Sequence, residues 1–230
     1  MAVTSSKVVE RGLRVFSESS FALAADLGQS NDPTAICVME HVRSWEVTWK
    51  GREKAAGETF DVRYLQRLPL GMSYVEQVHE VARLLGRPPL SLGCELAIDE
   101  TGVGRPVGDI FNNAGLKPTR ITITGGDSQS AKGPRRWHVP KGILISALDA
   151  RLHTGELRFA SELAEAGAMA EELKDFRRNV SAAGRYSYDA RVGKHDDLVL
   201  AVALALWVFT GKPKYQTPVT GTCSFVGKEK

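Results

Sequence analysis

Residues 21–40 read FALAADLGQSNDPTAICVME, and this stretch sets the expected fold. Two short apolar runs, Phe21–Asp26 and Ala35–Glu40, flank a link, 27–34, that is rich in turn-forming residues. The two runs are therefore predicted to pair as a hairpin, and the first of them ends at an acid. A third strand is expected at Phe60–Leu68, where apolar residues partly alternate. Three successive strands favour an antiparallel meander.

Downstream of the meander, strand and helix patterns alternate. A helix is expected after Ser73, because Ser73 and Glu76 have the spacing of a capping box. The apolar run Cys94–Asp99 predicts a strand that again ends at an acid, and Arg120–Thr124 predicts another strand. Further helices are expected at Pro106–Ala114, Lys141–Thr154, Glu162–Arg177 and Asp196–Thr210. This order predicts an α/β fold with a mixed sheet flanked by helices.

Length and composition indicate one globular domain. The chain has 230 residues, 43% hydrophobic and 25% charged, with a net charge of +3, which excludes collagen-like and wholly disordered classes. Its three cysteines contain no CxxC pair, so a zinc or disulfide framework is not expected, and reduced thiols fit a cytosol. Its longest apolar run is too short to cross a bilayer, and the N-terminus lacks the pattern of a signal peptide. We expect a lead-in over 1–20, one domain over 21–211 and a tail over 212–230.

Four aspartates have positions that suggest chemistry. Asp26 and Asp99 each end an apolar strand, and Asp196 and Asp197 open the apolar C-terminal helix. A carboxylate at the end of a core strand is costly to desolvate unless a cation meets it. Convergent carboxylates suit Mg²⁺ or Mn²⁺ rather than zinc. Two such ions, roughly 3.5–4 Å apart, could activate a water and stabilise the leaving oxygen of a phosphodiester.

Each acid also has an ordinary structural explanation. Asp26 could be a turn former before Gly28, and Asp99 could begin the turn that follows its strand. Asp196 and Asp197 could be an N-cap and a first-turn acid favoured by the helix dipole. The expected strand order makes convergence plausible, but the spacing alone does not settle it.

The residues around these acids resemble the nuclease motifs of phage terminase large subunits. Asp26-Leu-Gly-Gln29, followed by Asp32-Pro-Thr-Ala-Ile36, resembles the first motif. IDETGVG at 98–104 resembles the second, and HDDLVLA at 195–201 resembles the third. Matching stretches between them are LPLGMSY at 68–74, Thr124-Gly-Gly126 and Val139-Pro-Lys141. The resemblance runs in order from about Phe21 to Phe209.

This resemblance implies the ribonuclease H-like C-terminal nuclease domain of a terminase large subunit. Its activity would be metal-dependent cleavage of double-stranded DNA during genome packaging, in the host cytoplasm and without a membrane. Carried over, the catalytic metal ligands fall on Asp26, Asp99, Asp196 and Asp197. Successive helix residues point about 100° apart, so one of the last two would hold metal directly, and we favour Asp197.

The resemblance also implies partners beyond DNA. A motor ATPase domain or subunit and a capsid portal are expected. No GxxxxGK[ST] phosphate loop occurs in the sequence. We therefore expect either a nuclease fragment of a longer protein or a stand-alone relative.

Basic residues supply candidate DNA contacts. The segment 117–141 carries six cations against one acid, and its glycines and proline predict a flexible loop. Phosphate contacts of this kind position DNA without reading its sequence. His195 could transfer protons, but a structural role beside the metals is favoured. The candidate DNA-binding residues are Lys132, Arg135, Arg136, Lys141, Arg185 and Lys194.

Other functions stay open at this stage. A resolvase of branched DNA could use the same fold and acids. A module that docks on DNA or the portal, with weak cleavage in isolation, is a second alternative. Sugar kinases and actin-like ATPases also place a DxG after a strand, but they need a far longer chain.

Overall fold

A computed structural model describes residues 4–10, 13–28, 32–47, 53–102, 104–175, 177–180, 186–189 and 196–211. The strands are β1 (Thr4–Glu10), β2 (Leu13–Asp26), β3 (Ala35–Val47), β4 (Glu53–Arg67), β5 (Cys94–Asp99), β6 (Thr119–Thr124), β7 (Ser130–Gly133), β8 (Arg136–Pro140), β9 (Leu157–Phe159), β10 (Arg177–Val180) and β11 (Tyr186–Asp189). The helices are α1 (Tyr74–Leu85), the 3₁₀ helix η1 (Leu90–Leu92), α2 (Gly104–Asn113), α3 (Lys141–Thr154), α4 (Ala166–Asp175) and α5 (Asp197–Thr210).

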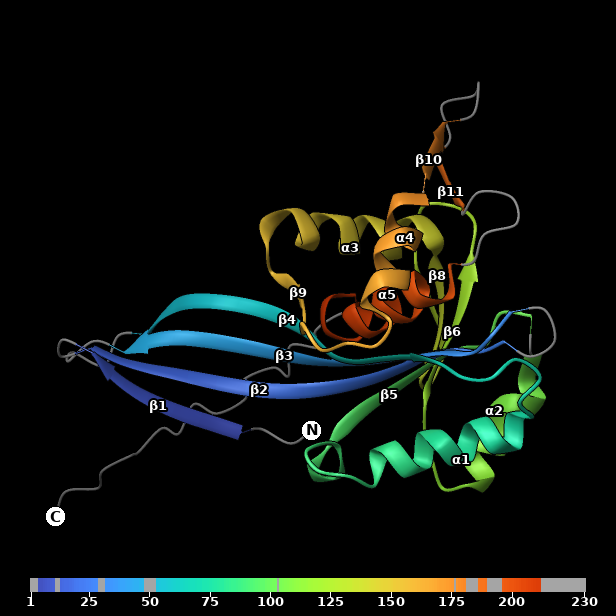
Figure 1. The fold of residues 1–230 in the computed structure, drawn as a ribbon, viewed down its shortest axis with the longest axis horizontal. Helices are drawn as coiled ribbons and strands as arrows, with labels where there is room; N and C mark the ends of the chain where they lie inside the picture. The colour runs from blue at the N-terminus through green and yellow to red at the C-terminus, as the bar shows by residue number, and fades with distance from the viewer. Residues whose placement is uncertain are drawn as a thin grey trace, which may run out of the picture.

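One mixed sheet organises the molecule (Figure 1). Its order is β7-β8-β6-β5-β2-β3-β4-β9, and β1 pairs with β2 outside this path. Strands β2, β3 and β4 form the predicted antiparallel meander. Strands β5, β6 and β8 run parallel to β2. The predicted fold class, a mixed sheet with helices on its faces, is therefore confirmed.

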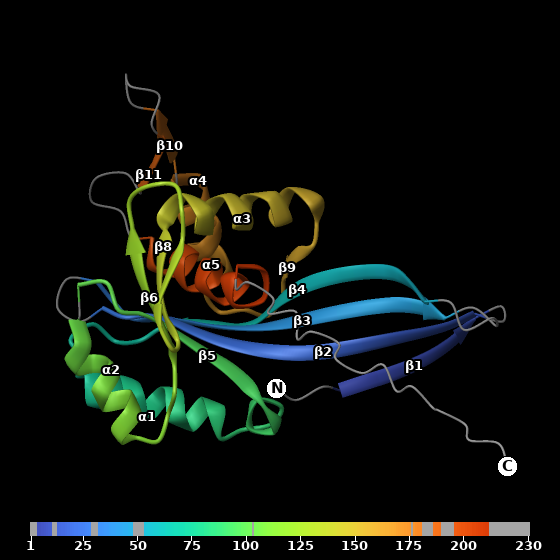
Figure 2. The same ribbon diagram turned by 180° about the vertical axis from the view of Figure 1, so that it is seen from behind.

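The meander strands are longer than their apolar runs. Strands β2, β3 and β4 have 14, 13 and 15 residues. Their far ends, together with β1, form an arm that extends away from the helices (Figures 1 and 2). Residues 4–10 and 13–20, which the sequence suggests as a lead-in, are β1 and the first half of β2. Backbone pairing holds this arm, helped by stacking of Phe16 on Trp45, so an apolar pattern does not reveal it.

Helices cover both faces of the sheet. Helices α1 and α2 lie on one face, and α3, α4 and α5 lie on the other (Figures 1 and 2). The α1 side holds a core that includes Leu23, Ile36 and Ile98. The α5 side holds a larger core, in which α5 is buried along nearly its whole length, as its uniform apolarity predicts. Because side chains alternate along a strand, Ala24 and Ala97 face α5, and so do Asp26 and Asp99.

Two expected elements differ from the structure. The glycine-rich basic segment is a hairpin, β7–β8, rather than a flexible loop. Gly133 and Arg135, at its turn, have positive φ angles. Glycines and prolines are typical of both loops and tight hairpin turns, so the sequence did not distinguish the two. The helix predicted over Glu162–Arg177 begins only at Ala166, because turn hydrogen bonds hold the preceding residues, and Arg177 begins β10.

The expected C-terminal tail, 212–230, lies outside the described residues. Among the helices that the structure describes, none has the length and apolarity to cross a bilayer.

Candidate functional site

The first two candidate aspartates leave the sheet side by side. Strands β2 and β5 are parallel, and Ala25 is the register partner of Ile98. The next residues are Asp26 and Asp99, so both acids end adjacent strands at the same edge. Asp99 is buried, with 6% of its surface exposed, and Asp26 is half-buried. The predicted neighbourhood of these two strand ends is therefore present in the fold.

The turn after Asp26 is fixed by hydrogen bonds. The Gly28 N–H donates to Thr34 Oγ1 at 2.9 Å, and the Thr34 hydroxyl donates to the Gly28 carbonyl at 2.9 Å. The Gln77 side chain of α1 donates to the same carbonyl at 2.8 Å. A Cβ at Gly28 would collide with the Asp32 carbonyl, so this position requires glycine. These contacts hold the end of β2, and with it Asp26.

The turn after Asp99 is held in a similar way. The Thr101 N–H donates to Asp99 Oδ1 at 2.7 Å, and the Thr101 hydroxyl oxygen accepts from the Ile123 N–H at 2.7 Å. The Glu100 N–H donates to the Ile121 carbonyl at 2.7 Å. The Asp99 carboxylate is thus tied through its own turn to β6.

The two aspartates at the start of α5 are held by different cations. Asp196 Oδ2 accepts from Lys141 Nζ at 2.8 Å, at the first residue of α3. Asp197 Oδ2 accepts from Arg67 Nε at 2.7 Å, at the end of β4. Asp197 is the more buried, with 4% of its surface exposed. The expected divergence of these neighbouring side chains is therefore visible in their partners.

A second acid shares the arginine that holds Asp197. Arg67 Nη2 donates to Glu172 Oε1, and Arg67 Nη1 lies 3.5 Å from Glu165 Oε2. Glu172 belongs to α4 and is 7% exposed. Its Oε2 accepts from the Val199 N–H at 3.0 Å, in the first turn of α5. Arg67 and Glu172 thereby connect β4, α4 and α5.

Sequence reasoning missed Arg67 and Glu172. Arg67 ends a strand, which is the same signal that marked Asp26 and Asp99. Glu172 follows the buried Met169 by three residues, so helical spacing places it on the buried side of α4. A charged residue on the buried side of a helix needs a partner, and that partner comes from a strand about a hundred residues earlier.

Three of the aspartates act electrostatically on the fourth, Asp26. Burial raises the pKa of Asp26 well above its usual value, and the charges of Asp99, Asp196 and Asp197 raise it further. Lys141 acts in the opposite direction. Burial also raises the pKa of Asp99, against the hydrogen bonds from Thr101. The structure therefore brings the other three predicted aspartates within electrostatic range of Asp26.

The donor set suits a hard divalent cation. It consists of carboxylates, and Asp197 Oδ1 is buried without a hydrogen-bond partner. A cation would satisfy that oxygen and relieve the mutual repulsion that raises the pKa of Asp26. As the side chains stand, no three of the described His, Cys, Asp and Glu residues are gathered in ligand geometry. Lys141 and Arg67 instead compensate the two aspartates of α5.

The candidate DNA-binding residues are distributed over several places. Lys141 lies in the aspartate cluster. Lys132 and Arg135 are exposed on the β7–β8 hairpin. Arg136 is the register partner of Arg120, whose guanidinium packs beside Gly108 of α2, so both face away from α5 and the acids. The remaining candidates, Arg185, Lys194 and His195, lie outside the described residues.

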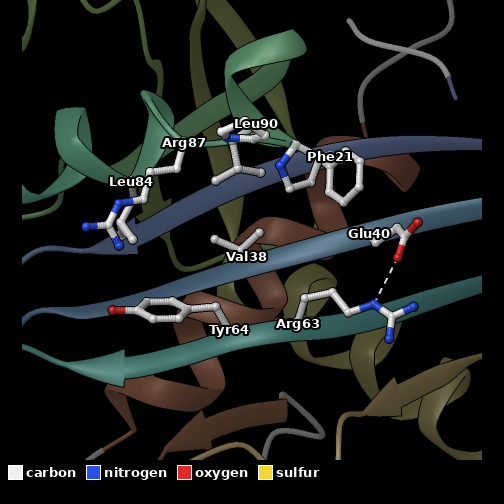
Figure 3. A pocket seen from close by; sticks show the side chains of 10 residues that line it. Phe21, Val38, Glu40, Arg63, Tyr64, Leu84, Arg87 and Leu90 are labelled. Carbon is white, nitrogen blue, oxygen red and sulfur yellow. Dashed lines mark hydrogen bonds and ion pairs between the residues drawn. The ribbon is translucent and has the colours of Figure 1, made fainter.

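Two hollows have linings that include none of the four aspartates. One, of about 340 Å³, is polar and is lined by Glu100, Arg120, Thr122, Lys132, Arg136, Trp137 and His138. The other, of about 390 Å³, lies between α1 and the sheet and is mainly apolar (Figure 3). Arg63 donates to Glu40 at 2.9 Å beside this second hollow. Trp137 itself packs edge-on against Trp207, with ring centroids 5.5 Å apart, which favours a core role over stacking on a base.

Comparison with known proteins supports the fold. No family model and no curated protein matches the sequence. Among solved structures, the large terminase nuclease of thermophilic phage G20c with bound magnesium matches with a TM-score of 0.53 and 18% identity, over 89% of this chain and 92% of that one. Its cobalt-bound form matches with a TM-score of 0.54 and 18% identity, over the same shares. The nuclease domain of the Thermus phage P74-26 large terminase matches with a TM-score of 0.52 and 18% identity, over 84% of this chain and 82% of that one.

Together, the topology and these similarities identify the fold. The mixed sheet, its three-strand meander and its flanking helices are a ribonuclease H-like architecture. More specifically, the chain has the fold of the large terminase nucleases of thermophilic phages.

Proposed function

We propose that this protein is a metal-dependent endonuclease that hydrolyses the phosphodiester bonds of double-stranded DNA. The observation that carries the proposal is the cluster of Asp26, Asp99, Asp196 and Asp197, with a buried unpartnered oxygen on Asp197. The fold shared with phage terminase nucleases, one of them solved with magnesium and cobalt, supports it. The corresponding biological step is the cutting of the genome during phage DNA packaging.

The four aspartates would hold Mg²⁺ or Mn²⁺, with two ions fitting a set of four carboxylates. Bound ions would activate a water and stabilise the charge on the leaving oxygen. The protein supplies the rigid placement of the carboxylates through the turns after β2 and β5, and their burial lowers the local dielectric. Lys141 holds Asp196, and its ammonium is placed to meet a phosphate that approaches the cluster.

Basic residues outside the cluster would bind the DNA backbone. Lys132 and Arg135 on the exposed hairpin are suited to phosphate contacts, which are independent of sequence. Arg136 faces the other side of the sheet and could contribute only if DNA passes around this edge. Arg185, Lys194 and His195 remain candidates from the sequence. A motor ATPase, a capsid portal and a location in the host cytoplasm belong to the same proposal.

The test is cleavage of supercoiled plasmid in Mg²⁺, Mn²⁺, Ca²⁺ or EDTA. We expect nicking and linearisation with Mg²⁺ or Mn²⁺, none with EDTA, and none by the Asp26→Asn variant. Asp149→Asn is the matched control, because Asp149 is exposed on α3 and pairs only with His153 among the described residues. Undiminished cleavage by Asp26→Asn, or cleavage by the wild type in EDTA, would exclude the proposal. Preference for four-way junctions over plasmid would instead indicate a resolvase.

A further inference from the structure

We infer that Arg67 and Glu172 form a positioning pair that makes Asp197, rather than Asp196, the metal ligand of α5. The inference rests on the proposed metal site and deepens it. Neither Arg67 nor Glu172 is a proposed metal ligand, and neither needs to contact the ion. Their role is to fix one oxygen of Asp197 so that the other is presented to the cluster.

The two carboxylate oxygens of Asp197 have different surroundings. Oδ2 accepts from Arg67 Nε at 2.7 Å, while Oδ1 is buried and has no hydrogen-bond partner. An unsatisfied buried carboxylate oxygen is costly, so it is expected to be retained for a ligand that binds there. Since Asp197 also acts on the charge of Asp26, this carboxylate adjoins the cluster that the cation would neutralise.

Arginine is required for this arrangement by its shape. Nε holds Asp197, and Nη2 of the same planar guanidinium holds Glu172. A lysine carries the same charge but offers one ammonium group without the fixed fork. The charge of Arg67 would repel a metal ion, so its contribution to the metal site would come from orienting Asp197 and not from attracting the ion.

Glu172 fixes the arginine and the helix together. One of its oxygens accepts from Arg67, and the other accepts from the Val199 N–H in the first turn of α5. The turn that carries Asp197 and the guanidinium that orients Asp197 are therefore attached to the same buried side chain. Asp196 lacks this support, because it is half-buried and is bound to Lys141 of α3.

The experiment titrates the full 230-residue chain with Mn²⁺ and follows free Mn²⁺ by electron paramagnetic resonance. Partners that orient metal ligands typically contribute 10–100-fold in affinity. We expect Arg67→Lys to weaken Mn²⁺ binding by about that factor, although it keeps the charge. We expect Glu172→Gln to weaken binding in the same direction. Glu171→Gln is the matched control, because it makes the same substitution at the adjacent residue of α4, which is exposed and pairs with Lys174 at 2.7 Å.

The outcomes separate the inference from the proposed function. Absence of Mn²⁺ binding by the wild type would remove the metal site itself. Wild-type affinity in Arg67→Lys, or equal affinities in Glu172→Gln and Glu171→Gln, would overturn the positioning role while leaving the site intact. Circular dichroism establishes that each variant is folded. If Arg67→Lys does not fold, the comparison of the two glutamate variants decides alone.

Discussion

Replacing Asp26 by asparagine should stabilise the metal-free protein and at the same time remove its stabilisation by metal. Asp26 has a raised pKa because the surrounding core desolvates its carboxylate and because Asp99, Asp196 and Asp197 repel its charge. Asparagine keeps the shape of the side chain and removes that charge. A carboxylate that destabilises the fold is expected in a carboxylate cluster when that cluster binds cations.

The magnitude follows from the spacing of the strands. Adjacent strands lie about 4.8 Å apart, so carboxylates at neighbouring strand ends can be roughly 6 Å apart. At an effective dielectric constant of about 20, two such charges repel by about 3 kcal/mol. Protonation of Asp26 and side-chain movement relieve part of this repulsion, which leaves an expected gain of about 1–2 kcal/mol. For a chain of this size that gain corresponds to an increase in Tm of about 3–6 °C.

Metal should reverse the order of stability. At an ion concentration of about 100 times Kd, the wild type gains about 2.7 kcal/mol, or roughly 5–10 °C in Tm. The variant should gain little, because the cluster has lost the carboxylate that lies among the other three. The assay is thermal unfolding of both proteins in EDTA and in a Mg²⁺ or Mn²⁺ series.

Asp149→Asn, an exposed change on α3, controls for the loss of one charge elsewhere. It should follow the wild type in both conditions. The reasoning is refuted if Asp26→Asn melts below the wild type in EDTA, or if metal raises the Tm of both proteins equally.

Three further measurements test the ionisation of Glu172 and the packing on the two faces of the sheet. Burial, with the charges of the α5 aspartates, raises the pKa of Glu172 to about 7. In EDTA, its contribution to the free energy of unfolding is therefore complete below about pH 4.5 and is lost as the pH rises through about 7, a loss of about 2 kcal/mol. Glu172→Gln should not show this loss, and parallel stability–pH profiles for the wild type and the variant would contradict the expectation. Leu204→Ala should cost about 2–5 kcal/mol in denaturant unfolding, because Leu204 is fully buried in α5; a cost below about 1 kcal/mol would show that the core can collapse around the site. Gly108 and Gly167 are both helical, so alanine gains about 1 kcal/mol of helix propensity at each. Gly108→Ala should nevertheless be less stable than Gly167→Ala by about 1–2 kcal/mol, because its Cβ would displace the buried Arg120 guanidinium, whereas the space around Gly167 is open. Equal effects would argue against the collision.

Local sequence signals predicted the elements that carry the aspartates. The runs Phe21–Asp26 and Cys94–Asp99 are apolar because their strands are covered on both faces, and both end where the structure ends them. The capping box at Ser73 and Glu76 is formed, and the helix over Lys141–Thr154 has the predicted bounds. Each of these signals depends only on residues that are close together in the chain, so it can be recognised in the sequence alone.

The sequence carries no local signal for strands that are held by backbone pairing and not by burial of apolar side chains. The arm built from β1 and the outer parts of β2, β3 and β4 is held by backbone hydrogen bonds, which any sequence can form. The β7–β8 hairpin has the glycines and the proline of a loop, and only its pairing with β6 makes it part of the sheet. The length of a strand and the strand that it pairs with depend on residues far away in the sequence.

The position of each aspartate at the end of a strand or the start of a helix follows from local sequence, because strand and helix boundaries depend on the spacing of apolar residues and turn formers. The hydrogen bonds of Arg67 to Asp197 and Glu172, and of the first turn of α5 to Glu172, arise from tertiary packing and have no local signal. The two contacts of Arg67 join residues 130 and 105 positions apart, and a buried charge pairs with whichever partner the packing of helices on the sheet brings close to it.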